Sequence, residues 1–111
     1  AQMVSNAKEI GSIAAAAYRQ NECFEAGVTF ARAEGIIPAP ESTHAVRHAI
    51  VEALEAKRDG TSRTILFNLS GHGHFDMQAY TDYFAGDLID DTFEPQKVEA
   101  ALAELPQVAA E

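Results

Sequence analysis

Apolar residues recur every three or four positions in the first third of the chain, which is the spacing of one face of an α-helix. Over residues 2–10 this repeat runs up to Gly11, and a short alanine-rich helix is expected after that glycine. From Asn21 onward an apolar face lies opposite a polar stripe, and Gly35 follows where a left-handed helix cap would stand. The pattern therefore predicts helices over 2–10 and 21–34, with a short alanine-rich helix between them.

A second group of helices is predicted further along the chain. Residues 38–40 read Pro-Ala-Pro, which forces an extended backbone, and apolar pairs then recur every four residues until Asp59-Gly60. This predicts a helix from about Glu41 to Arg58. Two more helices are predicted over 76–85 and 95–105, and their inner faces would consist of Met77, Tyr80, Phe84, Val98, Ala101, Leu102 and Leu105.

Residues 64–69 read Thr-Ile-Leu-Phe-Asn-Leu, a short run that is apolar throughout rather than alternating. Such a run after a helix is typical of a strand buried on both faces in a parallel sheet. We therefore expect an α/β fold that is mostly helical within this chain, with one buried parallel-type strand near 64–69. A single strand cannot form a sheet, so this pattern indicates a part of a longer protein.

The composition narrows the class of protein. The 111 residues carry a net charge of −9, which argues against nucleic acid as a partner, and residues 1–111 are expected to be a single domain or a fragment. No apolar run reaches the roughly 20 residues of a membrane span. Cys23 is the sole cysteine and is expected in the core rather than as a nucleophile. A soluble, cytoplasmic protein is the expectation.

Acidic residues are concentrated toward the C-terminus. Residues 76–111 hold nine acids and a single base, Lys97. We interpret the acidic tail, about 87–111, as a solvated surface rather than a docking site for a basic partner. No repeat or Gly/Ser linker marks a domain boundary.

Candidate chemistry is concentrated in residues 68–76, Asn-Leu-Ser-Gly-His-Gly-His-Phe-Asp. Ligands of parallel α/β sheets bind where strands end, and glycines let a backbone approach a ligand closely. A plain strand-to-helix turn with Asp76 as the helix cap is the alternative. A metal site is a further alternative, because His72-x-His74-x-Asp76 resembles the start of the metallo-β-lactamase motif. Met77 stands where that motif has its next histidine, so no metal site is expected.

Two histidines on the second long helix are further candidate ligands. His44 and His48 are spaced i, i+4 and share one helix face. We interpret them as a polar or partly buried helix face rather than as metal ligands.

Two segments together carry a resemblance to a known family. Residues 34–45, Glu-Gly-Ile-Ile-Pro-Ala-Pro-Glu-Ser-Thr-His-Ala, are followed after one helix by 67–76, Phe-Asn-Leu-Ser-Gly-His-Gly-His-Phe-Asp. This combination resembles the C-terminal quarter of the tryptophan synthase β-chain family. Two segments are most similar to the second class of that family: the Gly-His-Gly-His-Phe-Asp motif at 71–76, and residues 22–28, Glu-Cys-Phe-Glu-Ala-Gly-Val. The resemblance covers roughly residues 3–90.

The resemblance implies a pyridoxal-phosphate lyase of fold type II that condenses L-serine with indole to give L-tryptophan. Ser70 would bind the pyridine nitrogen of the cofactor, and Glu41 would lie near the ring. Gly71 and Gly73 would keep the wall beside the ring free of side chains. The family's cofactor-linking lysine and phosphate loop have no match in this sequence, so no catalytic residue is assigned here and the chain alone is expected to be inactive.

The resemblance leaves the partners partly open. The complete enzyme would be a homo-oligomer, and whether an α-subunit binds it stays open. The alternative from another class of protein is a small, acidic, mostly helical interaction domain in which the loop is only a turn.

Overall fold

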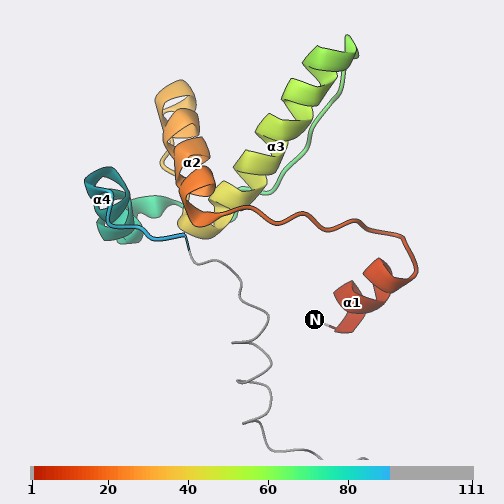
Figure 1. Cartoon of the computed structure of the whole chain (residues 1–111), viewed down its shortest axis with the longest axis horizontal. Helices are drawn as coiled ribbons and strands as arrows, with labels where there is room; N and C mark the ends of the chain where they lie inside the picture. Colours follow the sequence, from red (N-terminus) through yellow and green to blue (C-terminus); the bar gives the residue numbers. More distant parts are fainter. Residues whose placement is uncertain (1, 91–111) are drawn as a thin grey trace, which may run out of the picture.

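A computed structural model describes residues 2–90, in which four α-helices and one short 3-10 helix follow one another. The predicted helix over 95–105 and most of the acidic tail lie outside the described residues. The elements are α1 (Gln2–Glu9), α2 (Gln20–Glu34), α3 (Pro40–Asp59), η1 (Gly73–Asp76) and α4 (Met77–Ala85). In Figure 1, α2 and α3 begin side by side and diverge toward their C-terminal ends, α4 lies beside α2, and α1 lies apart from the other helices.

The ends of the two long helices are set by residues that the sequence pattern identified. Gly35 and Gly60 adopt the left-handed conformation, with φ of 71° and 67°, and their N–H groups donate to carbonyls of the last helical turn. At the start of α3, Pro40 takes the first helical position, where its missing N–H costs nothing. The predicted helices over 2–10, 21–34, about 41–58 and 76–85 are confirmed to within a few residues.

The core lies where α2, α3 and α4 meet. Gly27 of α2 faces Thr43 of α3 so closely that a Cβ at Gly27 would lie 2.6 Å from the Thr43 methyl carbon. The absence of a side chain there lets the two helices approach. One turn earlier on α2, the Phe24 ring packs edge-on against Tyr80 of α4 at 5.0 Å between centroids, so three helices share one apolar cluster.

The prediction of a buried strand over 64–69 is wrong. Within the described residues 2–90 the structure contains no strand, and the sole pairing outside helices is an isolated antiparallel bridge between Pro38 and His72. Residues 61–71, which we call the return segment, run back along α3 (Figure 1). Leu66, expected in the middle of a buried strand, is 97% exposed. No neighbouring strand accompanies the return segment in the described chain, so it has no ladder to join.

The predicted alanine-rich helix after Gly11 is also wrong, because residues 14–19 have no regular secondary structure. A helix of so few residues is marginal without tertiary packing. Instead, the Tyr18 hydroxyl makes a 2.7 Å hydrogen bond to Nδ1 of His48, which ties this segment to α3 in an extended form.

Candidate functional site

The loop that carries the candidate chemistry is fixed by backbone hydrogen bonds. The N–H of Gly73 donates to the Ile37 carbonyl at 2.8 Å, and the N–H of Ala39 donates to the Gly71 carbonyl at 3.1 Å. These two bonds flank the Pro38–His72 bridge. These backbone hydrogen bonds therefore fix the loop to the chain just before α3.

Tyr80 of α4 also binds the chain just before α3. Its hydroxyl donates to the Pro38 carbonyl at 2.6 Å, and the residue is almost fully buried. Burial, with a smaller contribution from Asp76, raises the pKa of Tyr80 to about 12. The phenol is thus neutral and remains a donor throughout the physiological range. Sequence reasoning assigned Tyr80 to an inner helix face but had no signal for this hydrogen bond.

The structure brings Ser70 to the start of α3. The hydroxyl oxygens of Ser70 and Ser42 lie 3.5 Å apart, and Ser42 directly follows Glu41. Ser70 and Glu41 are both exposed, whereas Ser42 is buried. Ser70 is therefore held at the first turn of α3, through a contact with Ser42 that the sequence pattern did not reveal.

Packing within this chain leaves little room for a side chain at Gly71 and Gly73. A Cβ at Gly73 would lie 2.8 Å from the Pro38 carbonyl oxygen, and one at Gly71 would lie 3.1 Å from the Cβ of Ala39. Both side-chain directions thus face residues 37–39, so these glycines permit the close approach of the two backbone segments. This packing accounts for them without a ligand, and their place in a cofactor wall stays a prediction.

The histidines do not gather into a metal centre in residues 2–90, where no three His, Cys, Asp or Glu side chains come together in that way. His72 Nδ1 instead accepts a hydrogen bond from the backbone N–H of His74 at 3.3 Å. Asp76 occupies the cap position of α4, but its side chain makes no capping hydrogen bond.

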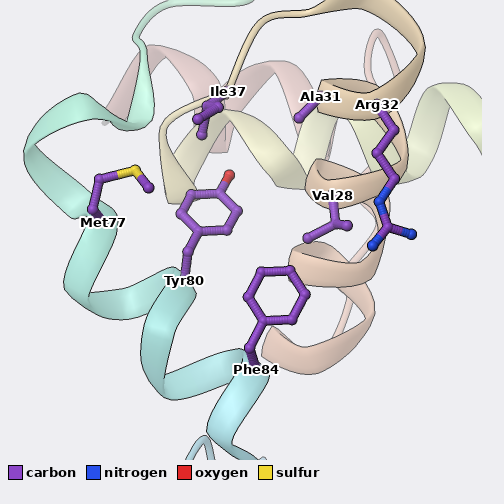
Figure 2. A pocket seen from close by; sticks show the side chains of 7 residues that line it. All are labelled: Val28, Ala31, Arg32, Ile37, Met77, Tyr80 and Phe84. Carbon is purple, nitrogen blue, oxygen red and sulfur yellow. The ribbon is translucent and has the colours of Figure 1, made fainter.

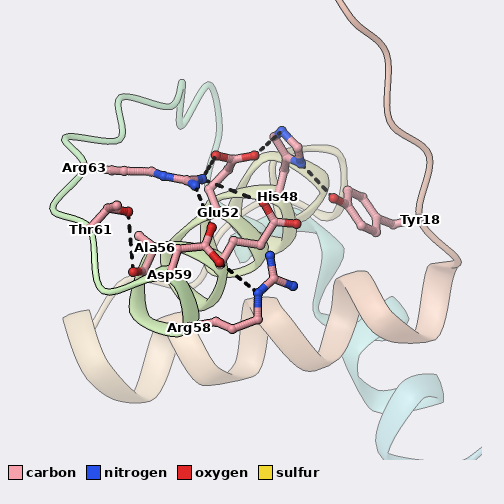
Figure 3. Close-up of polar contacts among 9 residues, drawn as sticks. Tyr18, His48, Glu52, Ala56, Arg58, Asp59, Thr61 and Arg63 are labelled. Carbon is pink, nitrogen blue, oxygen red and sulfur yellow. Dashed lines mark hydrogen bonds and ion pairs between the residues drawn. The ribbon is translucent and has the colours of Figure 1, made fainter.

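His44 and His48 have different partners on the surface of α3. His48 lies in a polar network with Tyr18 and Glu52, as Figure 3 shows. Glu52 also accepts from the Arg63 guanidinium at 2.8 Å, which fastens the return segment to α3. His44 Nδ1 instead lies 3.3 Å from the Cys23 sulfur. Cys23 is buried, as the sequence predicted, and burial raises the pKa of its thiol.

An apolar pocket of about 320 Å³ opens between α2 and α4. Figure 2 shows its lining, formed by Val28, Ala31, Arg32, Ile37, Met77, Tyr80 and Phe84. A second apolar groove lies between the diverging ends of α2 and α3 and includes Phe30 and Phe67. Several large apolar side chains are exposed around them, and Phe84 has 65% of its surface free.

Such open apolar faces are typical of a segment that packs against further protein. These exposed apolar faces are what a part of a larger domain would present to the rest of that domain. No helix of residues 2–90 is long and apolar enough to cross a bilayer.

Comparisons with known proteins place this part in one family. The chain is 57% identical over 90 residues to tryptophan synthase beta chain 2 of Aquifex aeolicus, covering 81% of this chain and 21% of that protein. It is 62% identical over 79 residues to the beta chain 2 of Methanosarcina acetivorans, covering 71% and 18%. For the tryptophan synthase beta chain of Pyrococcus horikoshii the identity is 55% over 96 residues, covering 86% and 20%. No family model matches the chain.

The chain spans about a fifth of the length of the curated relatives it matches. It is a fragment of a tryptophan synthase β-like protein, which confirms the family inferred from residues 34–45 and 67–76.

Proposed function

We propose that this chain contributes one wall of the cofactor site in a pyridoxal-phosphate enzyme that condenses L-serine with indole to give L-tryptophan and water. The observation that supports the proposal is the 3.5 Å approach of the Ser70 and Ser42 hydroxyls, which brings Ser70 to the first turn of α3, the turn that also carries Glu41. The proposed reaction is inferred from the name of the relatives, tryptophan synthase beta chain.

The chemistry of these side chains fits the cofactor. A neutral hydroxyl can donate a hydrogen bond to a pyridine nitrogen without placing a negative charge beside it, so the nitrogen stays largely unprotonated. Bound pyridoxal phosphate supplies an electron sink for bonds at the substrate α-carbon, and an unprotonated ring nitrogen tempers that sink. Ser70 would therefore orient the ring and favour β-replacement over transamination, and the Glu41 carboxylate would lie near the ring on the same side.

The other parts of such an active site would lie elsewhere in the complete protein. Lys8 lies on α1 and Lys57 lies in the exposed last turn of α3, whereas Ser70 contacts the first turn of α3. Neither lysine is therefore near Ser70. The lysine that carries the cofactor and the loop that binds its phosphate would come from the rest of the enzyme. We propose that the complete enzyme is a homo-oligomer of fold type II, with the α-subunit as an optional partner.

The test compares the chain with the complete protein of which it is a segment. We expect the complete protein to form tryptophan from serine and indole with pyridoxal phosphate, and the 111-residue chain to form none. A complete protein that makes no tryptophan would refute the enzyme, and the small acidic interaction domain would then be the better interpretation. Tryptophan formation by the chain alone would refute the proposal that the cofactor lysine and the phosphate loop come from the rest of the enzyme.

Variants of the complete protein test Ser70 itself. Ser70→Asp places an anionic acceptor at the ring nitrogen and favours its protonation, so products should shift away from tryptophan. Ser70→Ala removes one hydrogen bond, which is worth on the order of 1 kcal/mol of cofactor affinity. Ser62→Ala is the matched control, because Ser62 is exposed on the same return segment. If both Ser70 variants match this control in cofactor spectrum and products, Ser70 does not face the ring.

A further inference from the structure

The apolar pocket between α2 and α4 has two ends that can be told apart. Near the start of α2, the Phe24 ring stacks on Tyr83 near the end of α4, at 5.6 Å between centroids. At the other end, Met77 at the start of α4 shares the pocket lining with Ile37, which follows α2 (Figure 2). The two helices therefore run in opposite directions along the pocket. The lining on α4, from Met77 to Phe84, spans about 10 Å at 1.5 Å per residue.

The chain leaves the described residues beside the start of α2. The backbone N–H of Asn21 donates to the Asp90 carboxylate at 2.9 Å, and the Asn21 side-chain amide donates to the Leu88 carbonyl at 3.1 Å. Asp90 is thus held at the first turn of α2, about 10 Å along that helix from Val28 in the pocket lining. Residues 91–94, if extended, reach about 13 Å at roughly 3.3 Å each. The segment after them therefore starts within reach of the pocket.

That segment has an apolar face of matching length. The sequence predicts a helix over 95–105, with a proline at its first position and Pro106 directly after it. Apolar residues recur along one face of this predicted helix at the spacing i, i+3, i+4, i+7, and they are Val98, Ala101, Leu102 and Leu105. From first to last this face would span about 10 Å, which is the length of the pocket lining on α4.

Charge and tethering favour this segment over other occupants. Arg32 is the charged residue of the pocket lining, and no carboxylate of the described residues forms an ion pair with it. Residues 91–111 hold five acids and a single base, so opposite charges would meet beside the pocket. A second copy of the chain would offer the same apolar face. A segment joined by a short linker, however, has an effective concentration in the millimolar range, so the chain's own segment fills the pocket first.

We propose that residues 95–105 form a helix that docks its apolar face into the pocket between α2 and α4 and runs parallel to α2. This helix covers Met77 and Phe84, which are 45% and 65% exposed in the described chain, and its acidic face remains in solvent. The docking is a property of this chain and does not rest on the proposed enzyme activity.

The two methionines of the chain provide a probe and a reference. Met77 lines the pocket, whereas Met3 lies on α1. In carbon-13 NMR of the labelled 111-residue chain, we expect nuclear Overhauser contacts from the Met77 methyl to Leu102 and Leu105, and none from Met3. These contacts should not depend on chain concentration. Their absence overturns the proposal and leaves the pocket to the rest of the complete protein. Contacts that appear only at high concentration also overturn it, because the occupant is then a second copy.

Two substitutions separate docking by one face from a general effect of charge. Leu102→Glu puts a charge on the docking face and should abolish the contact between Met77 and Leu105. Ala103→Glu is the matched control, because it adds the same charge one residue later, on the opposite face of the predicted helix. This control should keep the contact of the unmodified chain. Equal losses in both variants, or an unchanged contact in Leu102→Glu, contradict the proposal. If a variant fails to fold, the contacts in the unmodified chain still decide.

Discussion

Replacing Gly27 by Ala tests the close approach of α2 and α3. The added carbon would lie 2.6 Å from the Thr43 Cγ2 atom and 3.0 Å from the Tyr80 hydroxyl oxygen. Both neighbours are buried and hydrogen-bonded, Thr43 to the Pro40 carbonyl and Tyr80 to the Pro38 carbonyl. Neither can swing away without losing a bond, so the helices themselves must move.

Two opposing contributions set the size of the effect. Alanine is favoured over glycine in a helix interior by about 1 kcal/mol, and overfilling a packed core costs typically about 1–3 kcal/mol. We therefore expect Gly27→Ala to lower the free energy of unfolding by between about 0 and 2 kcal/mol. Thr43→Ser removes the clashing methyl and keeps the hydroxyl, so Gly27→Ala should be less damaging in that background by about 1 kcal/mol or more.

The assay is urea unfolding of the four chains of this double-mutant cycle, followed by far-UV circular dichroism. Ala33→Gly, at an exposed position of the same helix, is the control for a glycine–alanine exchange away from the contact with Thr43. A stabilising Gly27→Ala with no coupling to Thr43→Ser would refute the close approach of the helices at this point.

The remaining predictions concern the loop and its supports. Tyr80→Phe removes the donor to the Pro38 carbonyl and should lower the free energy of unfolding by about 1 kcal/mol at neutral pH in urea melts. Burial raises the pKa of Tyr80 to about 12, above its ordinary value of 10, so the protonated hydroxyl stabilises the folded chain fully below pH 10. This stabilisation is lost as the pH rises through 12. Urea melts across this range should show the loss in the unmodified chain but not in Tyr80→Phe. Gly73→Ala should destabilise by about 1–3 kcal/mol because its Cβ would meet a carbonyl oxygen, more than Gly71→Ala, and equal effects in the same melts would contradict the packing. Arg63→Ala should speed amide hydrogen exchange in the return segment while changing overall stability by less than about 1 kcal/mol, since its ion pairs are at the surface.

The sequence predicted the helices well because their signals are local. The apolar spacing of α2 and α3 and the glycines at their ends act within a turn or two of the residues concerned. The loop of residues 68–76 and Glu41 were also selected from sequence, through their resemblance to a family. What the pattern could not contain was the contact between Ser42 and Ser70, because two hydroxyls far apart in sequence carry no shared periodicity.

The strand over 64–69 was mispredicted for a related reason. A short, largely apolar run indicates an extended backbone, but a strand also needs a partner that supplies hydrogen bonds, and that partner is not encoded in the run itself. The backbone of these residues is indeed drawn out beside α3, but without a ladder (Figure 1). Local pattern identified the extended conformation and not the pairing.

The Pro38–His72 bridge fixes the distance that the return segment must span from the end of α3. The 20 residues of α3 are about 30 Å long at 1.5 Å each, and the segment over 61–71 must cover that distance backward to reach the bridge. Fully extended, it reaches about 36 Å at roughly 3.3 Å per residue. A single helical turn of four residues would shorten it by about 7 Å, more than the slack of about 6 Å. The length of α3 therefore dictates where Ser70 is held, and inserting one turn into that helix would pull the serine out of reach of Ser42.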